Sequence, residues 1–310
     1  MQFDCNMKLS RRPLIAAFIA SLPLFSPALR ADTLQVATLH PVLTNLAREV
    51  GGALVKVTAI VPAGADVHHF APTPADVKKL TGSPVILVAG KNLETYLDKL
   101  RSNLTNGQQI VEVGRTIPSE KIEPGDELFL CCPEHAKGAI DPHWWNSVEN
   151  MQRAGRIIAD AYADKDPANK AAYRANAAAW SARLDDLKKW AKKEISVIPA
   201  ERRKLATAHL SLRYFAKEFG FKLLPVQGLN HNTAATPQEL ELAVKLIREK
   251  KITAVFPEQG VNPKYLKQLA TETGVKIAGE LIADGNGTGD LASYEASFRH
   301  NIQTIVEALK

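Results

Sequence analysis

Cysteine is scarce in this chain, with only three among 310 residues. Cys5 lies near the N-terminus, and Cys131 and Cys132 are adjacent. Adjacent cysteines do not connect distant segments, so a disulfide scaffold is excluded. The sequence leaves two alternatives open for the adjacent pair, a strained vicinal disulfide or two thiols.

Strong net charge and long apolar runs are lacking as well. The formal net charge is +6, and half of this excess comes from the first 31 residues, so the remainder is nearly balanced. No clustered basic face for a nucleic-acid partner is predicted. Beyond that leader, no apolar run reaches the roughly 18 residues that a membrane-spanning helix needs.

The N-terminus has the order of a secretory signal peptide. The basic stretch Lys8–Arg12 precedes the apolar run Leu14–Phe25, and small residues precede two plausible cuts, after Ala28 or Ala31. Residues 1–31 are therefore predicted to direct export to the periplasm, by the Sec route or, given the paired arginines, by the twin-arginine route. Because no cysteine closely follows the apolar run, no lipid anchor is expected.

Short β-branched runs alternate with amphipathic segments in two separate parts of the chain. This βαβ alternation predicts an α/β fold with two lobes, each built on a mostly parallel sheet. The strands are predicted at 34–38, 55–60, 85–88 and 109–113, and then at 205–208, 221–226, 253–256 and 275–278, with helices at 237–250 and 263–273.

One long helix is predicted between the lobes. Apolar residues from Tyr173 to Ala191 recur at steps of three and four, and no glycine or proline occurs between Pro167 and Pro199. A helix of about 30 residues and about 45 Å follows from this pattern. The predicted organisation is an N-terminal lobe at 32–165, a connecting helix at 166–198 and a C-terminal lobe at 199–310.

Two pairs of histidines occupy corresponding positions in the two predicted lobes. His40 follows the first strand of one lobe as His209 follows the first strand of the other. His68 precedes Thr73-Pro74 by the same interval that separates His231 from Thr236-Pro237. Since ligands of open α/β sheets collect beyond the carboxyl ends of the strands, all four could face a cleft between the lobes.

Three of the eight histidines, with one aspartate, form a candidate metal-binding set. His68, His143 and His209 lie in loops that open successive units, and Asp284 lies in a glycine-rich segment. Three imidazoles and a carboxylate suit Zn²⁺, and with a bidentate aspartate also Mn²⁺ or Fe²⁺. A zinc hydrolase remains a rival interpretation, with Glu258 as its best candidate base, although a supporting role behind a ligand fits Glu258 better. A surface adhesin is a second rival.

Four motifs carry a family resemblance over residues 34–310. Gly64–Pro74 resembles the G-x-D-x-H-x-[YF]-x-P-x-P segment of the zinc- and manganese-binding solute-binding proteins of bacterial ABC transporters, the TroA/ZnuA-like superfamily. Asp141–Trp145 is similar to its D-P-H-x-W motif. Ala208–Gly220 and Gly279–Asp284 resemble its third and fourth ligand segments. Val67 departs from the proline that the family usually has there.

The resemblance implies a function and a ligand set. His68, His143, His209 and Asp284 would bind the metal between the lobes, whereas His69 would be a neighbour and not a ligand. Histidine at the third position favours Zn²⁺, with Mn²⁺ or Fe²⁺ as alternatives. The protein would be a monomer, not an enzyme, that delivers its metal to an ABC permease in the cytoplasmic membrane, with a periplasmic metallochaperone as a candidate second partner.

Three further expectations concern loops and spare histidines. The segment 123–138 holds acidic residues, His135 and both adjacent cysteines, and either collects zinc weakly or is only a solvated acidic loop. The glycines at 285–289 predict a loosely held loop, which would make Asp284 the ligand most easily withdrawn. His40 and His231 are candidates for a second, transit site.

Overall fold

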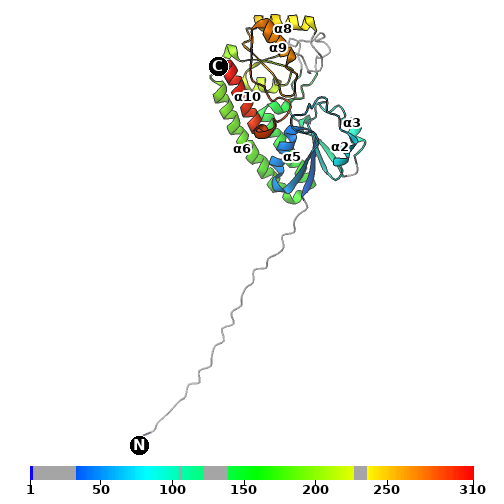
Figure 1. The fold of residues 1–310 in the computed structure, drawn as a ribbon. Coiled ribbons are helices and arrows are strands. Elements are labelled where there is room, and N and C mark those ends of the chain that lie inside the picture. The colour runs from blue at the N-terminus through cyan, green and yellow to red at the C-terminus, as the bar shows by residue number, and fades with distance from the viewer. Residues whose placement is uncertain (3–32, 105–106, 122–138, 227–235) are drawn as a thin grey trace. The chain divides into compact units, whose positions relative to one another are not determined.

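The computed structural model describes residues 1–2, 33–104, 107–121, 139–226 and 236–310, and residues 33–310 form one compact unit. In the described part of this unit, two four-stranded parallel sheets have the orders β2-β1-β3-β4 and β6-β5-β7-β8 (Figure 1). Each sheet thus repeats one plan, with its first strand in the interior. The predicted two-lobed α/β fold is confirmed.

The strands of both sheets lie close to their predicted positions. The N-terminal sheet comprises β1 Leu34–Thr38, β2 Val55–Ala59, β3 Val85–Val88 and β4 Gln109–Glu112. The C-terminal sheet comprises β5 Lys204–Thr207, β6 Lys222–Pro225, β7 Ala254–Phe256 and β8 Lys276–Ile277. The helices are α1 Pro41–Gly51, α2 Pro74–Lys79, α3 Leu97–Arg101, α5 Val148–Lys165, α6 Lys170–Ile195, α7 Arg213–Phe219, α8 Pro237–Glu249, α9 Lys264–Thr273 and α10 Tyr294–Leu309.

Helices α2 and α8 begin in the same way, which supports the predicted similarity between the two lobes. Thr73 and Thr236 each cap their helix in a capping box, with Asp76 and Glu239 as the reciprocal partners, and proline follows each cap. The fixed φ of proline and the two paired backbone N–H groups favour a sharp helix start.

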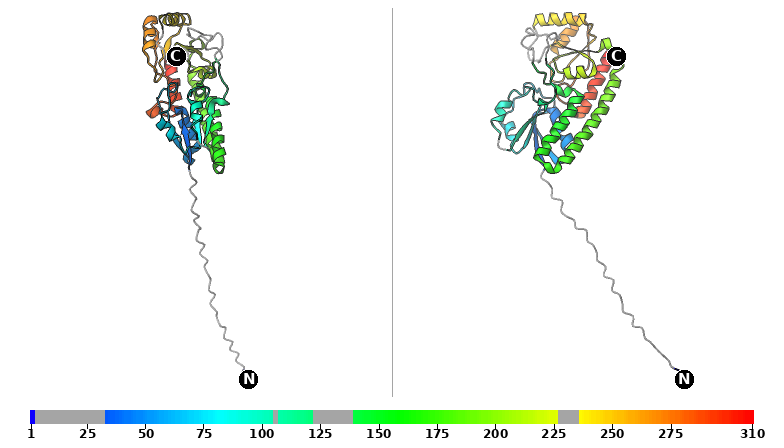
Figure 2. Two further views of the ribbon diagram at one scale, coloured as in Figure 1. Left: turned by 90° about the vertical axis from the view of Figure 1, so that its right-hand side faces the viewer. Right: turned by 180° about the vertical axis from the view of Figure 1, so that it is seen from behind.

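Helix α6 is the predicted connecting helix, although it is shorter than expected, with 26 residues. A separate 3₁₀ turn, Pro167–Asn169, precedes it, because Asn169 bonds back to Asp166 instead of continuing the α-helical ladder. Figure 2 shows α5 and α6, in green, lying side by side. Arg183 of α6 pairs with Glu49 of α1 and Glu295 of α10, so this helix connects elements of both lobes.

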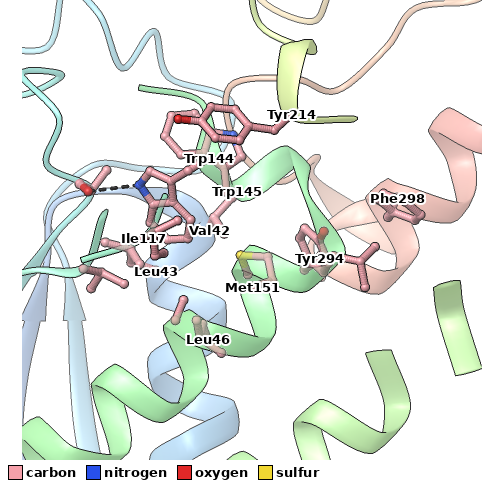
Figure 3. Packing of buried hydrophobic residues seen from close by; sticks show 14 of the residues in the cluster. Val42, Leu43, Leu46, Ile117, Trp144, Trp145, Met151, Tyr214, Tyr294 and Phe298 are labelled. Carbon is pink, nitrogen blue, oxygen red and sulfur yellow. Dashed lines mark hydrogen bonds between the residues drawn. The ribbon is translucent and has the colours of Figure 1, made fainter. Parts of the chain in front are cut away.

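One large hydrophobic core runs through both lobes. It joins the N-terminal sheet, α1, α5 and α6 to α7, α10 and one face of the C-terminal sheet. Figure 3 shows part of it, including Val42, Trp144, Met151, Tyr214 and Phe298. A smaller cluster covers the other face of the C-terminal sheet under α8 and α9. The strand ends of the two sheets are therefore supported by continuous packing.

Gly114 is a close-packed point beside this core, and its replacement gives a first prediction. A Cβ atom there would lie 2.5 Å from the Ala89 carbonyl oxygen and 2.5 Å from Trp144 Nε1, which are hydrogen-bonded to each other at 3.0 Å. Gly114→Ala is expected to lower the free energy of unfolding by about 1–3 kcal/mol, measured by urea denaturation. Gly279→Ala, which meets only the Thr304 side chain, is the milder control. A Gly114→Ala protein as stable as wild type would contradict the packing argument.

Some expectations fall on residues outside the described ranges. They concern the signal peptide, the cysteines, the acidic segment 123–138 and His231. Within the described ranges, no helix combines the length and the apolar character needed to cross a membrane.

Candidate metal centre

Four side chains that lie far apart in the sequence meet beyond the carboxyl ends of the strands. His68 lies in the loop after β2, and His209 lies two residues after β5. His143 immediately precedes the 3₁₀ turn Trp144–Asn146, and Asp284 lies in the segment after β8. The strand-end rule for open α/β sheets accounts for this convergence, because each sheet ends its parallel strands at one edge.

The ligand atoms of these four residues lie within 4.8 Å of one another. Asp284 Oδ1 is 3.3 Å from His143 Nε2, 3.4 Å from His209 Nε2 and 3.7 Å from His68 Nε2. Despite these three neighbours, Asp284 Oδ1 accepts no hydrogen bond from the described residues. His143 Nε2 and His68 Nε2 are 3.1 Å apart. Three imidazole nitrogens and one carboxylate oxygen that converge this closely are a donor set that fits a metal ion at their centre.

Two buried carboxylates fix the orientation of two of these imidazoles. Asp141 Oδ1 is 2.7 Å from His143 Nδ1, and Glu258 Oε2 is 2.8 Å from His209 Nδ1. Glu258 also accepts hydrogen bonds from the His209 backbone N–H and from Ser211 Oγ. A carboxylate at Nδ1 keeps the proton on that nitrogen and directs the Nε2 lone pair toward a metal. Glu258 thus has the supporting role expected of it and is not a free base.

Asp66 and Asp141 each stabilise the backbone turn that leads to a histidine of the group. Each lies two residues before a histidine of the group, and each accepts the backbone N–H of that histidine at 2.9 Å. This Asx-type turn is a short-range feature, readable as Asp-x-His in both motifs. Neither aspartate was assigned a role from the sequence, although the Asp-x-His spacing repeated in both motifs was a signal for one.

The pKa values of three residues in the metal-free site are strongly shifted. Burial alone lowers the pKa of His143, but Asp141 and then Asp284 outweigh it and raise the pKa to about 9. The pKa of His209 is likewise raised well above its usual value, because Glu258 and Asp284 outweigh burial. For Asp284, burial favours the neutral acid, but the positive charge of His209 above all holds its pKa well below the usual range. In the metal-free site, the pKa values of His143 and His209 are thus raised toward the protonated form, and that of Asp284 is lowered toward the carboxylate.

The backbone just before Asp284 is held by several side chains. The preceding Ala283 carbonyl accepts hydrogen bonds from Trp145 Nε1 at 2.7 Å and Asn146 Nδ2 at 2.9 Å. Asn301 pairs with both the N–H and the carbonyl of Ile282. These bonds hold the two residues before Asp284, whereas the expectation of a loosely held loop concerns the glycines at 285–289 and stays a prediction.

Exposure differs across the group. His143 and His209 are buried, whereas the side chains of His68 and Asp284 each keep 13% of their surface accessible. An ion from solvent would therefore meet His68 and Asp284 before it reached the two buried imidazoles.

The remaining histidines near the site lie outside the group of four. His69 Nδ1 pairs with Asp66 Oδ2 at 2.5 Å, and His69 is not among the converging residues. His40 is buried and caps α1 through Nδ1, which accepts the Val42 N–H at 3.3 Å. A second site formed by His40 and His231 stays a prediction, because His231 lies outside the described residues.

Comparisons with known proteins point to one family. The family described as "Zinc-uptake complex component A periplasmic" matches residues 36–308. The manganese-binding lipoprotein MntA of Bacillus subtilis is 34% identical over 284 residues, covering 89% of this chain and 90% of that protein. The iron-binding protein YfeA of Yersinia pestis is 28% identical over 290 residues, covering 93% of this chain and 90% of that protein.

A solved structure gives the same result for the fold. The periplasmic zinc-binding protein TroA of Treponema pallidum superimposes with a TM-score of 0.78 at 26% identity, covering 89% of this chain and 99% of TroA. The matched family consists of solute-binding proteins for metal transport and not of enzymes. This chain therefore belongs to the ZnuA/TroA family of substrate-binding proteins of metal ABC transporters.

Proposed function

We propose that this chain captures one divalent metal ion, Zn²⁺, with His68, His143, His209 and Asp284, and delivers it to an ABC permease. The observation that carries the proposal is the convergence of three Nε2 atoms and one carboxylate oxygen within 4.8 Å, with Asp284 Oδ1 accepting no hydrogen bond from the described residues. Four protein ligands of this kind match the tetrahedral preference of Zn²⁺.

The proposal includes the organisation and location of the chain. Residues 1–31 act as a signal peptide cut after Ala28 or Ala31, and the mature protein works in the periplasm. Residues 32–165 and 199–310 form the two lobes, and 166–198 connect them. The family membership supports the permease as partner, since its relatives serve ABC transporters.

Manganese is the second candidate cargo, and the names of the relatives favour it. The two MntA relatives, from Halalkalibacterium halodurans and Bacillus subtilis, are named manganese-binding at 30% and 34% identity. The donor set of this chain favours zinc instead, because three of its four donors are imidazole nitrogens and the fourth is a single carboxylate. Mn²⁺ prefers more oxygen ligands than these residues provide directly.

The decisive test is uptake, because almost any nitrogen-rich site binds Zn²⁺ more tightly than Mn²⁺ in solution. In a strain lacking this gene and grown with a chelator, restoring the wild-type chain is expected to raise cellular zinc at least about threefold relative to the empty vector. Manganese content should stay unchanged, and both metals are measured by mass spectrometry of washed cells.

A matched control separates uptake from mere expression. The His209→Ala chain should reach the same periplasmic level without restoring zinc, because it lacks one of the proposed ligands. Restoration of manganese alone would replace zinc with manganese as the cargo. Restoration of neither metal by the wild-type chain would overturn the proposed function.

A further inference from the structure

His40 is a buried imidazole at the topological counterpart of a proposed ligand. It lies two residues after β1, as His209 lies two residues after β5, and both strands are interior strands of their sheets. Both side chains are essentially inaccessible. The repeated plan therefore brings a histidine to the same strand end in each lobe, but only one of them is in the converging group of four.

The hydrogen bonds at Nδ1 give these two histidines opposite tautomers. His209 Nδ1 faces the Glu258 carboxylate, so a neutral His209 ring carries its proton on Nδ1 and directs its Nε2 lone pair into the group of four. His40 Nδ1 instead accepts the Val42 N–H at the start of α1. A neutral imidazole that accepts at Nδ1 carries its proton on Nε2. Burial lowers the pKa of His40 to about 3, so the ring is neutral and Nε2–H is a donor.

This donor is buried and has no hydrogen-bond partner among the described residues. An unsatisfied buried N–H is costly, and native proteins rarely keep one without a purpose. The His40 ring packs 4.2 Å from the ring of Trp145, which in turn lies 5.3 Å from the ring of His143. The next residue, Pro41, lies 3.5 Å from the position a Cβ of Gly285 would take, directly after Asp284. The His40 ring is therefore linked to His143 through Trp145, and the residue after His40 packs against the residue after Asp284.

The charges of the group also act on His40. Its pKa, lowered mainly by burial, is raised by Asp284 and lowered further by His143 and His68. Three of the four proposed ligands thus lie within electrostatic reach of the ring, and the one that attracts its proton is the carboxylate.

We propose that His40 determines metal selectivity by donating its Nε2–H to an oxygen atom in the coordination shell of the bound ion. That oxygen belongs either to Asp284 or to a water molecule on the metal. The inference rests on the proposed function, because it needs a metal held by the group of four. It also replaces the idea of His40 as a second-site ligand, since the cap on α1 occupies its only lone pair.

The consequence is a difference between metals. A four-coordinate Zn²⁺ ion is satisfied by the four side chains and gains little from a donor to an additional oxygen. Mn²⁺ needs further oxygen ligands, and a fixed N–H that orients a second carboxylate oxygen or a water stabilises that larger shell. His40 therefore makes the site more tolerant of Mn²⁺ than its four ligands alone would be.

Two substitutions separate the Nε2–H donor from the helix cap. His40→Asn keeps an acceptor near the position of Nδ1, because asparagine is a good N-cap, but it lacks the distal donor. His40→Gln reaches the position of Nε2 with an amide N–H but loses the cap geometry. Metal-free mature protein is titrated with Zn²⁺ and with Mn²⁺ against a competing chelator for the wild type and both variants.

We expect His40→Asn to weaken Mn²⁺ binding about tenfold, which corresponds to about 1.4 kcal/mol, and Zn²⁺ binding less than about threefold. His40→Gln should keep the wild-type ratio of the two affinities while lowering the melting temperature. The visible spectrum of the Co²⁺-loaded protein gives an independent reading. Loss of the donor in His40→Asn should strengthen the absorption that marks four-coordinate Co²⁺, which a merely structural role would not change.

The outcomes distinguish the two proposals. Equal weakening of both metals by His40→Asn, or no change in either metal or in the Co²⁺ spectrum, would overturn the role of His40 and leave the proposed function intact. A wild-type chain that binds neither metal tightly would overturn the proposed function, and the role of His40 with it.

Discussion

Replacement of His143 with alanine is expected to weaken Zn²⁺ binding by about 100- to 1000-fold. Binding free energies of zinc sites with four protein ligands are about 10–16 kcal/mol, so one ligand contributes about 2.5–4 kcal/mol. His143 is firmly held, because its side chain is buried and Asp141 fixes its Nδ1. The rings next to His143 belong to Trp145, which is not a metal ligand, and to His68 and His209, which are already proposed ligands. Titration of the mature chain with Zn²⁺ against a chelator under native mass spectrometry measures the loss.

His69→Ala is the matched control for this experiment. His69 is adjacent to a proposed ligand in sequence, but it pairs with Asp66 and lies outside the converging group. Its removal should change the Zn²⁺ affinity less than about threefold. If His69→Ala weakened binding as much as His143→Ala, or if His143→Ala still bound zinc with wild-type affinity, the assignment of the four ligands would be wrong.

Much of the fold could be predicted because the relevant signals are local. The runs Leu34–Thr38 and Val85–Val88 are short, apolar and bounded by turn residues, and both are strands with the predicted ends. Boundaries were less certain where the flanking residues are ambiguous. The connecting helix starts at Lys170 because the 3₁₀ turn at Pro167–Asn169 satisfies its own backbone first.

The convergence of the four candidate ligands was only partly predictable. The strand-end rule brings His209 and Asp284 to one edge of their sheet, and the resemblance supplied the complete set. The groups that hold these residues in place were less visible, since Trp145 and Asn146 reach the Ala283 carbonyl from more than 130 positions earlier in the chain. Such long-range contacts carry no periodic signal in a single sequence.

His40 illustrates the same limit at a finer scale. Its position after the first strand of the N-terminal lobe corresponds to that of His209 in the C-terminal lobe, and this similarity suggested that His40 is also a ligand. Its chemistry is decided by which group meets Nδ1, a backbone N–H for His40 and a carboxylate for His209. Both histidines lie two residues after their strand, so their position in the sequence does not reveal this difference.

Zinc affinity is expected to rise steeply with pH over a window that extends to about pH 9. The sequence alone predicts a loss of affinity below about pH 6.5, the usual histidine pKa. In the structure the pKa of His143 is raised to about 9, and that of His209 is raised well above its usual value. A metal ion must displace these protons, so each displaced proton contributes up to about a tenfold change in affinity per pH unit. From pH 8 to pH 7 the affinity should therefore fall about 10- to 100-fold.

The stability of the metal-free protein should depend on pH in the opposite sense. Because the pKa of His143 is higher in the folded than in the unfolded chain, its contribution to stability is complete below about pH 6.5 and is lost as the pH rises through about 9. The melting temperature without metal is thus expected to fall between pH 6 and pH 9.5, while the increase on adding zinc grows.

Calorimetry in buffers with different protonation enthalpies measures the displaced protons directly, and we expect one to two protons per zinc ion at about pH 7.5. Asp141→Asn removes the carboxylate that contributes most to raising the pKa of His143. This variant should therefore release fewer protons and show a shallower pH dependence, even though its zinc affinity is also reduced because His143 is less well oriented. Zinc binding at pH 7.5 without proton release would show that the imidazoles are already neutral in the metal-free protein, and the charge distribution derived from the structure would then be wrong.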